Sequence, residues 1–363
     1  MEVTAAVART PGAPLEMAQL RMDAIQPDEV LVRVVAVGIC HTDLAVQHGH
    51  IPVPLPAVLG HEGAGIVEAI GADVTGLRPG DHVIMSQALC GNCRQCQLGE
   101  PAYCEHAARL SLGGCREDGS STLTDSSAPL SGNFVGQSSF ATHAITKARN
   151  SYRVAADLPL DVLAPVGCGV MTGVGAVLND ARLQAGQSIA VFGCGTVGLA
   201  SIMAAKAAGA SQIVAVDLNE SRLELAVKLG ATHAVASGES VAASVRDVTL
   251  GGADVAIEAA GVPSVASAAV AATRSRGRTV IVGAAPYGSR LDLDWWQVAA
   301  GRTVQGSVVG SADPAKDIPR LVDMWRAGHL PLADLIRTYP FAAVNQAITD
   351  MASGSVIKPV LLM

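Results

Sequence analysis

The pattern of hydrophobic positions changes at about Cys168. Before this residue, short β-branched runs broken by Gly, Pro and Asp occur at 29–40, 63–74 and 80–90. Runs of this kind predict strands joined by irregular loops. After Cys168, short apolar runs alternate with Ala-rich stretches of helical periodicity. The chain is therefore expected to have a mainly β part followed by an α/β part.

The second part is expected to consist of strand–helix–strand units. The predicted strands are 188–192, 212–217, 254–258 and 279–283, and the interleaved helices are 197–209, 220–230 and 264–277. Alternation at this spacing is typical of a doubly wound parallel sheet, the Rossmann type of α/β fold.

Three further stretches lie outside these units. Residues 318–327 predict a helix, and residues 358–362 predict a closing strand. Residues 105–134 are rich in Gly, Ser and Asp and have no apolar period. We expect them to form a long surface loop, of the kind that often borders a site.

Length and composition fit two domains with small aliphatic cores. At 363 residues the chain exceeds the usual size of one domain. Half of the residues are hydrophobic but only 3% are aromatic, so the core must be built from Ala, Val, Leu and Ile. Such side chains suit a parallel sheet with closely packed helices.

The charged residues argue against nucleic acid as a partner. The formal net charge of −7 is spread along the chain, without a Lys/Arg cluster or interleaved basic and aromatic residues. A small-molecule substrate is therefore expected. The most apolar stretch, 189–205, contains three glycines and is shorter than the ~20 residues that span a bilayer. Because the N-terminus also lacks a signal-peptide pattern, we expect a cytoplasmic protein without membrane contact.

A dinucleotide-binding motif follows the first predicted strand of the α/β part. Gly193, Gly195 and Gly198 form GxGxxG between the strand SIAVF and an Ala-rich helix. Such a turn lets a pyrophosphate approach the N–H groups of the helix N-terminus. Asp217 ends the next strand, where a carboxylate accepts hydrogen bonds from ribose hydroxyls and repels a 2′-phosphate. The expected cofactor is NAD. The alternative for Asp217 is a residue that caps the next helix.

Four cysteines form a compact cluster in the mainly β part. Cys90, Cys93, Cys96 and Cys104 are spaced CxxCxxCx7C. Four thiolates at this spacing can surround a tetrahedral Zn²⁺. An iron–sulfur cluster is the alternative, but the long last spacing and a second candidate metal site favour zinc. Because sulfur fills all four positions, this zinc is expected to hold the local loop together and to do no chemistry.

Three further candidate ligands are scattered along the sequence. Cys40 lies in GICHTD, His61 in GHEGAGIVEAIG, and Cys168 in GCGVMTGVG. Singly, each has an ordinary explanation as a core residue. In this order, and together with CxxCxxCx7C and GxGxxG, they resemble the zinc-containing medium-chain dehydrogenase/reductase family over residues 31–362.

The resemblance implies a fold, two zinc ions and NAD. It implies a mainly β, GroES-like catalytic domain at 1–169 and 309–363, and an NAD-binding Rossmann domain at 170–308. It assigns the catalytic zinc to Cys40, His61 and Cys168. Two thiolates and one imidazole leave the fourth position open for water or the substrate oxygen.

Further site residues are assigned from the family by position. Asp43 matches a residue that orients the ligating His, and Glu62 matches an acid near the metal that assists ligand exchange. Thr42 matches a hydroxyl that hydrogen-bonds the alcohol and passes its proton outward, and Phe134 matches a position in the substrate channel. The positions that match cofactor-binding residues are Thr196 in the glycine motif, and His41, Thr172, Val197, Arg222 and Lys358. The alternative for the last five is a solvated or packing side chain.

One position departs from the family. Many members have a histidine five residues after the first zinc ligand, at the end of the proton relay, where this chain has Ala45. The hypothesis is that water or His48 takes the proton that Thr42 passes on.

The implied activity is the reversible oxidation of a primary alcohol to the aldehyde, with hydride transfer to NAD. The segments FVGQSSFATHA, LAPVGCGVMTGVGAVLN and YPFAAVNQAI resemble the aryl and allylic alcohol dehydrogenase branch. A thiol-adduct-dependent formaldehyde dehydrogenase, a non-catalytic zinc- and NAD-binding protein, and a zinc-free quinone or enoyl reductase are the alternatives. Because cofactor domains of the family pair across a two-fold axis, a homodimer or homotetramer is expected, with the contact near residues 280–283 and the segment after them.

Overall fold

The computed structural model describes residues 1–126, 128–286 and 288–363. They form two compact units, each with its own sheets and hydrophobic core. The first unit holds residues 1–168, 313–322 and 332–363, and the second holds residues 169–312 and 323–331.

The first unit is mainly β. Its strands are β1 (Glu2–Ala8), β2 (Glu16–Met22), β3 (Glu29–Gly38), β4 (Ala57–Val58), β5 (Glu62–Ile70), β6 (His82–Met85), β7 (Leu123–Asp125), β8 (Ala128–Leu130), β9 (His143–Lys147), β10 (Ser151–Val154), β17 (Ile336–Pro340) and β18 (Lys358–Leu362). Its α-helices are α1 (His41–Gln47), α2 (Arg94–Gln97), α3 (Ala107–Leu112), α4 (Leu160–Leu163), α12 (Val344–Ala352) and the start of α11 (Pro314–Arg326).

These strands form two sheets, and β3 is the central strand of the larger one. The sheets have the orders β4-β1-β2-β7-β8 and β10-β6-β5-β3-β18-β17, and β9 also pairs with β3. Val30, Val32 and Val34 in β3 are buried, while Arg33 between them is exposed. This alternation places every second side chain of the strand in the core. The ends of β3 and β5 carry the candidate zinc ligands Cys40 and His61.

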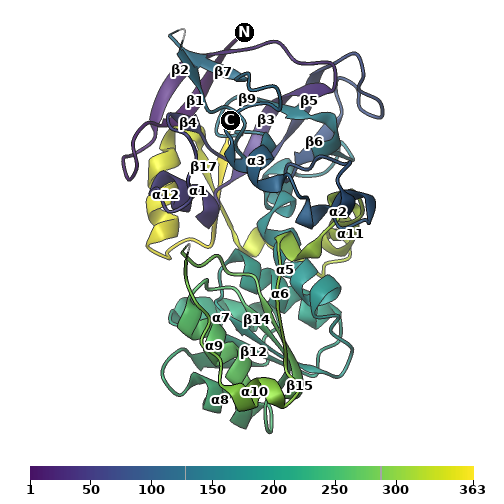
Figure 1. Cartoon of the computed structure of the whole chain (residues 1–363), viewed down its shortest axis with the longest axis vertical. Helices are drawn as coiled ribbons and strands as arrows, with labels where there is room; N and C mark the ends of the chain where they lie inside the picture. Colours follow the sequence, from purple (N-terminus) through teal and green to yellow (C-terminus); the bar gives the residue numbers. More distant parts are fainter. Residues whose placement is uncertain (127, 287) are drawn as a thin grey trace. The chain divides into compact units, whose positions relative to one another are not determined.

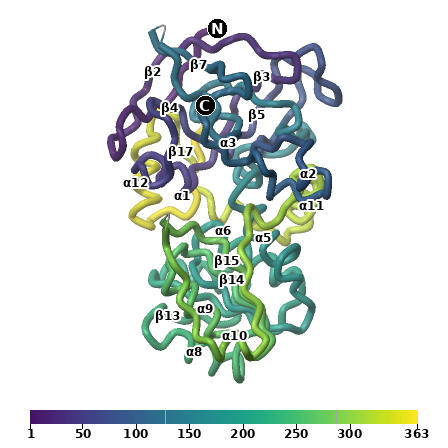
Figure 2. The backbone as a smooth tube through the Cα atoms, in the orientation of Figure 1, coloured from purple at the N-terminus to yellow at the C-terminus, as the bar shows by residue number. Residues whose placement is uncertain are grey.

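The C-terminal segment of the chain completes the first unit. Strand β18 pairs with β3, with Val360 opposite Gly38, and the side chain of Asn345 in α12 binds both backbone groups of Leu15. Figure 2 shows this segment in yellow. The predicted strand at 358–362 is confirmed. The predicted helix at 318–327 is also present, and it begins earlier, at Pro314.

The expected long loop at 105–134 is wrong in part. It contains α3, β7 and β8, which pairs with β7 and extends the five-stranded sheet. These elements have six, three and three residues. Segments this short show no hydrophobic period in the sequence, so the pattern could not reveal them.

The second unit is a parallel sheet flanked by helices. Its strands are β11 (Ser188–Phe192), β12 (Gln212–Asp217), β13 (His233–Ala236), β14 (Ala253–Glu258), β15 (Thr273–Ile281) and β16 (Thr303–Gly306). Its α-helices are α5 (Gly169–Gly175), α6 (Thr196–Ala207), α7 (Glu220–Leu229), α8 (Val241–Val248), α9 (Pro263–Ala272) and α10 (Trp295–Ala299), and a π-helix follows α5 at 176–180.

The strand order of this sheet is that of a Rossmann fold. The order is β13-β12-β11-β14-β15-β16 and every pair is parallel, so the direction of winding reverses between β11 and β14. Figure 1 labels β12, β14 and β15 of this sheet. Ala190, Phe192, Val214 and Val216 on one face share a core with side chains of α8 and α9. In such sheets, ligands bind outside the carboxyl ends of the strands at the reversal point.

The pattern of the sequence predicted four of the six strands. No residue of β13 or β16 is buried, so no buried apolar run marks these strands. The predicted helix at 264–277 is wrong beyond Ala272, because residues 273–277 form the start of β15. Thr273 is fully buried and its hydroxyl donates to the carbonyl of Val270, which ends the Ala-rich helix.

Among the described residues, no single helix has the length and apolar character needed to cross a bilayer, although the bent pair 160–167 and 169–180 would pass on those two criteria alone.

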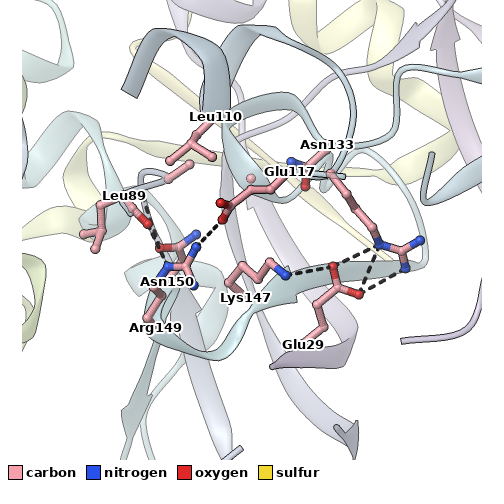
Figure 3. A pocket seen from close by; sticks show the side chains of 11 residues that line it. Glu29, Leu89, Leu110, Glu117, Asn133, Lys147, Arg149 and Asn150 are labelled. Carbon is pink, nitrogen blue, oxygen red and sulfur yellow. Dashed lines mark hydrogen bonds and ion pairs between the residues drawn. The ribbon is translucent and has the colours of Figure 1, made fainter. Parts of the chain in front are cut away.

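A buried ion pair fixes the loop after α3 to the start of β3. The guanidinium of Arg116 donates to both carboxylate oxygens of Glu29 at 3.0–3.2 Å, and both side chains are at most 3% exposed. The carboxylate borders a cavity of about 20 Å³, which has room for one water molecule. Figure 3 shows Lys147 pointing to Glu29 from one side of this cavity, and Arg149 to Glu117.

Replacing Glu29 by Gln should destabilise the protein strongly. The substitution leaves the buried Arg116 guanidinium with only Asp23 as a carboxylate partner, so the free energy of unfolding should fall by about 3 kcal/mol. The matched control is Glu16→Gln, which removes one of the two carboxylate partners of Arg9, the other being Asp125, and should cost less than about 1 kcal/mol. Chemical denaturation measures both. Equal losses in the two variants would contradict the role of the buried pair.

Candidate functional site

The first ligand segment is held by a short helix and its capping residue. Cys40 is the N-cap of α1, and its backbone N–H donates to Oδ2 of Asp43 at 2.8 Å. The side chain of Asp43 thus occupies the N-terminal end of the helix, where the dipole favours negative charge. The position of Cys40 after β3 is therefore fixed from both sides, by the sheet and by the helix.

The second oxygen of Asp43 reaches the other ligand segment. Oδ1 accepts from Nδ1 of His61 at 2.9 Å and from the backbone N–H of Gly60 at 3.1 Å, and Asp43 is 1% exposed. Because Nδ1 faces a carboxylate, it carries the proton and the lone pair of Nε2 is free for a metal. The orienting role predicted for Asp43 matches this geometry.

Residues far apart in the sequence converge at this point. One ligand atom each from Cys40, His61, Glu62 and Cys168 lies within 4.8 Å of all the others. A tetrahedral zinc with bonds of ~2.0–2.3 Å separates its ligands by about 3.3–3.8 Å, so small movements would close this group around one ion. The chemistry of the set, two thiols, one imidazole and one carboxylate, fits zinc.

The electrostatics of the cluster also favour a cation. The thiol of Cys168 donates a hydrogen bond to Cys40. This bond, together with the charge of His61, holds the pKa of Cys40 well below its ordinary value. The same bond raises the pKa of Cys168. Burial would lower the pKa of His61, but the charges of Asp43 and Cys40 outweigh it and raise this pKa. A bound metal replaces these protons, because the ligands must be deprotonated thiolates and a neutral imidazole.

Glu62 forms a buried ion pair with Lys358. The ammonium of Lys358 lies 3.0 and 2.9 Å from the two oxygens of Glu62 and 2.8 Å from the carbonyl of Ile39. Burial raises the pKa of Glu62 to about 7, although the charge of Lys358 opposes the shift. The sequence suggested a cofactor contact for Lys358. Within the first unit the structure places this side chain on Glu62, and the cofactor contact stays a prediction.

Three more predicted residues lie near or on α1. The hydroxyl of Thr42 is 3.8 Å from Sγ of Cys40, beside the metal site, and His41 is exposed. His48 follows the helix and its Nδ1 donates to the carbonyl of Leu44 at 2.8 Å. Six helical residues span ~9 Å and point about 240° apart, so His48 does not share a face with Thr42.

Phe134 packs against the imidazole of His61. The two rings meet edge to face with centroids 5.5 Å apart, and Phe134 is fully buried. In this structure Phe134 therefore supports a zinc ligand, and its predicted place in the substrate channel stays a prediction.

The four-cysteine cluster forms a second metal site, as expected. The sulfur atoms of Cys90 and Cys96 are 3.9 Å apart, as are those of Cys93 and Cys104. Zn–S bonds of ~2.3 Å place the sulfurs of a tetrahedron about 3.8 Å apart, so the set fits a single zinc ion. The backbone N–H of Cys96 contributes most to lowering the pKa of Cys93 to about 6, which favours the thiolate.

Most of the residues predicted to bind the dinucleotide lie in the second unit, whereas His41 and Lys358 lie in the first. Gly193, Gly195 and Gly198 form the turn between β11 and α6, and an added Cβ on Gly198 would lie 1.8 Å from the carbonyl oxygen of Gly193. Gly195 is the N-cap of α6. Gly195 has no side chain that could cap the first turn of α6, and a helix N-terminus of this kind favours an anion. Thr196 and Val197 begin this helix, and Thr172 is buried in α5.

Asp217 is held by the glycine turn. Its Oδ2 accepts from the N–H of Cys194 at 2.6 Å and its Oδ1 from the N–H of Asn219 at 2.9 Å. The N-cap of α7 is Asn219, so the capping role considered for Asp217 belongs to its neighbour. Nε of Arg222 is buried without a hydrogen-bond partner among the described residues. A helix N-terminus without a side-chain cap, a fixed carboxylate and an unpartnered guanidinium nitrogen fit a dinucleotide.

Two buried polar residues at the zinc cluster were not expected. Ser86 and Gln137 are each 1% exposed, and their side chains bind the backbone next to His61 and Cys168. Gln137 lies in the segment FVGQSSFATHA, whose resemblance did not single it out, and Ser86 lies in no motif with a characteristic spacing. Their only signal in the sequence is a polar residue beside an apolar segment, which is common at the end of a strand.

Comparison with known proteins agrees with this geometry. Residues 26–156 match the alcohol dehydrogenase GroES-like domain family, and residues 196–326 match the zinc-binding dehydrogenase family. The chain is 42% identical to a geraniol dehydrogenase from Castellaniella defragrans, over 99% of this chain and 97% of that protein.

Two solved structures are similar over the whole chain. One is an alcohol dehydrogenase zinc-binding domain protein from Burkholderia ambifaria, with a TM-score of 0.98 and 46% identity. The other is a benzyl alcohol dehydrogenase from Acinetobacter calcoaceticus, with a TM-score of 0.96 and 42% identity. Each match covers 100% of this chain and 99% of the other. With both zinc sites in place, these relationships establish the chain as a zinc-dependent alcohol dehydrogenase of the medium-chain dehydrogenase/reductase family.

Proposed function

We propose that this enzyme oxidises a primary alcohol with a bulky apolar group, of the aryl, benzylic or allylic kind, to the aldehyde, with NAD as the oxidant. The observation that carries the proposal is the convergence of Cys40, His61, Glu62 and Cys168. With Glu62 held in its ion pair with Lys358, the two thiolates and the imidazole would bind zinc and leave the fourth position for a substrate oxygen. The substrate class is supported by the two relatives named for geraniol and benzyl alcohol, each 42% identical over nearly the whole chain.

Each residue of the site has a separate role in the oxidation. When bound, zinc lowers the pKa of a hydroxyl that reaches it, and the oxidised dinucleotide accepts the hydride. Asp43 keeps the imidazole of His61 in the required tautomer. The hydroxyl of Thr42 lies beside Cys40 and can take the proton of the substrate hydroxyl.

The end of the proton path differs from that of many relatives. Thr42 and Ala45 are three residues apart on α1 and share a face of the helix. A histidine at 45 could follow Thr42 in a relay, whereas Ala45 cannot. His48 lies beyond this face, at the end of the helix. Transfer to His48 therefore needs a bridging group, such as the ribose or a water molecule.

Removing the hydroxyl of Thr42 should slow the chemical step. In Thr42→Val the proton of the alcohol loses its first acceptor, so kcat for alcohol oxidation should fall by about 10²–10⁴. Thr42→Ser keeps the hydroxyl and is the control, with kcat close to that of the wild type. Steady-state kinetics with unchanged zinc content make the comparison. Wild-type kcat in Thr42→Val would exclude this role.

The dinucleotide is assigned to the second unit. We take residues 170–308 as the NAD-binding domain and residues 1–169 and 309–363 as the catalytic domain. The GxGxxG turn and Asp217 lie at the carboxyl ends of β11 and β12, next to the reversal of winding. A carboxylate at Asp217 favours NAD over NADP, because it would repel a 2′-phosphate.

Substitutions at two glycines of the motif should affect NADH binding and protein stability separately. A Cβ on Gly195 meets no atom within 4 Å, so Gly195→Ala should leave stability unchanged and weaken NADH binding where the pyrophosphate approaches. A Cβ on Gly198 meets the Gly193 carbonyl, so Gly198→Ala should lower the free energy of unfolding by about 1–3 kcal/mol. NADH fluorescence titration and chemical denaturation measure the two effects. If Gly195→Ala bound NADH with unchanged affinity, the glycine turn would not be the cofactor-binding site.

A homodimer, or a tetramer built from dimers, is the proposed assembly. Strand β16 ends the parallel sheet, and nearby Trp295 and Trp296 in α10 are 79% and 77% exposed. An open edge beside large exposed aromatic side chains is a surface that a second copy could cover in a symmetric contact.

A substrate panel tests the proposed function. The zinc-loaded enzyme should form NADH faster with benzylic and allylic alcohols than with ethanol, and without added thiol. Activity on formaldehyde only with a thiol would support the thiol-adduct alternative. No turnover by protein that binds two zinc ions and NADH would support a non-catalytic binding protein.

A further inference from the structure

Gln137 is a fully bonded amide buried beside the catalytic ligands. It is 1% exposed, and its Nε2 donates to the carbonyls of His61 at 2.9 Å and Ser86 at 3.4 Å. Its Oε1 accepts from the N–H of Gly63 at 3.0 Å. The amide therefore binds the backbone on both sides of Glu62, in the segment that carries His61.

Ser86 extends these contacts to the third ligand. Its hydroxyl donates to the carbonyl of Gly167 at 2.7 Å, one residue before Cys168. Gln137 binds the carbonyl of Ser86, so one amide is connected to the segments of two zinc ligands that are more than a hundred residues apart. Both bridging side chains are buried, so water does not compete for their bonds.

The turn around Gln137 is itself held in an unusual conformation. Val135 and Ser138 have φ of 48° and 47°, in the left-handed region that side chains other than glycine rarely adopt. The hydroxyl of Ser138 stabilises this turn, since it accepts from the N–H of Phe134 at 2.8 Å and donates to the carbonyl of Val58 at 2.6 Å. Strained backbone of this kind persists where the surroundings over-determine it, and it is frequent at functional sites.

The same turn supports His61 from a second direction. Phe134 packs edge to face on its imidazole, and the N–H groups of Ser139 and Phe140 donate to the carbonyls of Gly60 and Leu59. Residues 134–140 therefore bind both the ring of His61 and the backbone before and after it. A ligand held at so many points has little freedom to move when a metal arrives.

We propose that Gln137 is a positioning residue of the catalytic zinc site, which holds the His61 and Cys168 segments at the spacing that metal binding requires. Gln137 offers zinc no ligand and acts only through the backbone of the ligand segments. The proposal rests on the catalytic zinc described above. It assigns to an uncharged amide a part of the site's rigidity beyond that of Asp43, whose hydrogen bonds among the described residues reach Cys40, Gly60 and His61.

Gln137→Glu keeps the shape of the side chain and its acceptor for the N–H of Gly63. It replaces the amide nitrogen that donates to the carbonyls of His61 and Ser86 by a carboxylate oxygen. The loss of supporting hydrogen bonds around a metal site costs about 10–100-fold in metal affinity, so zinc should leave the catalytic site at least tenfold faster. The measurement is zinc release from the full chain into excess chromogenic chelator. The Cys₄ zinc is an internal control, because Gln137 contacts none of its ligands among the described residues. Gln137→Met, which lacks donor and acceptor, should have the same effect.

Asn345→Asp is the matched control elsewhere in the first unit. The Asn345 amide also binds a backbone N–H and a carbonyl, both at 2.9 Å and both on Leu15. This variant should release both zinc ions at the wild-type rate. Cobalt substitution provides a second readout, since a displaced His61 or Cys168 should change the visible absorption of cobalt in the catalytic site.

Zinc release at the wild-type rate and an unchanged cobalt spectrum in both Gln137 variants would overturn the proposal. Release of the catalytic zinc from Asn345→Asp as fast as from the Gln137 variants would also overturn it. If the Gln137 variants do not fold, Ser86→Ala decides, because it removes only the bond to Gly167. Faster release of the catalytic zinc in that variant supports the proposal, and a wild-type rate contradicts it. Failure of the proposed function would be seen separately, as absent turnover by wild-type enzyme that carries two zinc ions.

Discussion

The catalytic site depends on one buried carboxylate that binds two distant segments. Asp43 caps α1 at Cys40 with one oxygen, and with the other it accepts from His61 and from the backbone of Gly60. A carboxylate that is 1% exposed needs such donors, because a buried charge without partners is costly. The requirement is mutual. The carboxylate needs these donors, and the two ligands need this acceptor to point at one place.

The two metal sites are built on different physical principles. The Cys₄ site is local, since its four ligands lie within fifteen residues and their loop can close around an ion with few tertiary contacts. The catalytic site gathers ligands from the ends of β3 and β5 and from the turn before α5. It therefore exists only when the sheets of the first unit are formed. Buried polar contacts, those of Asp43 and of the pair Glu62–Lys358, then set the orientation of each ligand.

The parts of the structure that local pattern determines were predictable from the sequence. Strands β11, β12 and β14 and the glycine turn follow from apolar runs and glycine spacing, and the Cys₄ site follows from spacing alone. Strands β13 and β16 were missed because none of their residues is buried. Gln137 and Ser86 were missed because their importance arises from backbone groups that only the fold brings together. The resemblance to a family supplied Cys40, His61 and Cys168, which no local rule connects.

The structure provides each chain with two zinc sites of unequal construction. Anomalous diffraction at the zinc edge from crystals of the enzyme tests it most directly. Two peaks per chain are expected, one among Cys90, Cys93, Cys96 and Cys104, and one bonded to Cys40, Nε2 of His61 and Cys168. A single peak in the Cys₄ site of fully active enzyme, or a second peak away from His61, would contradict it.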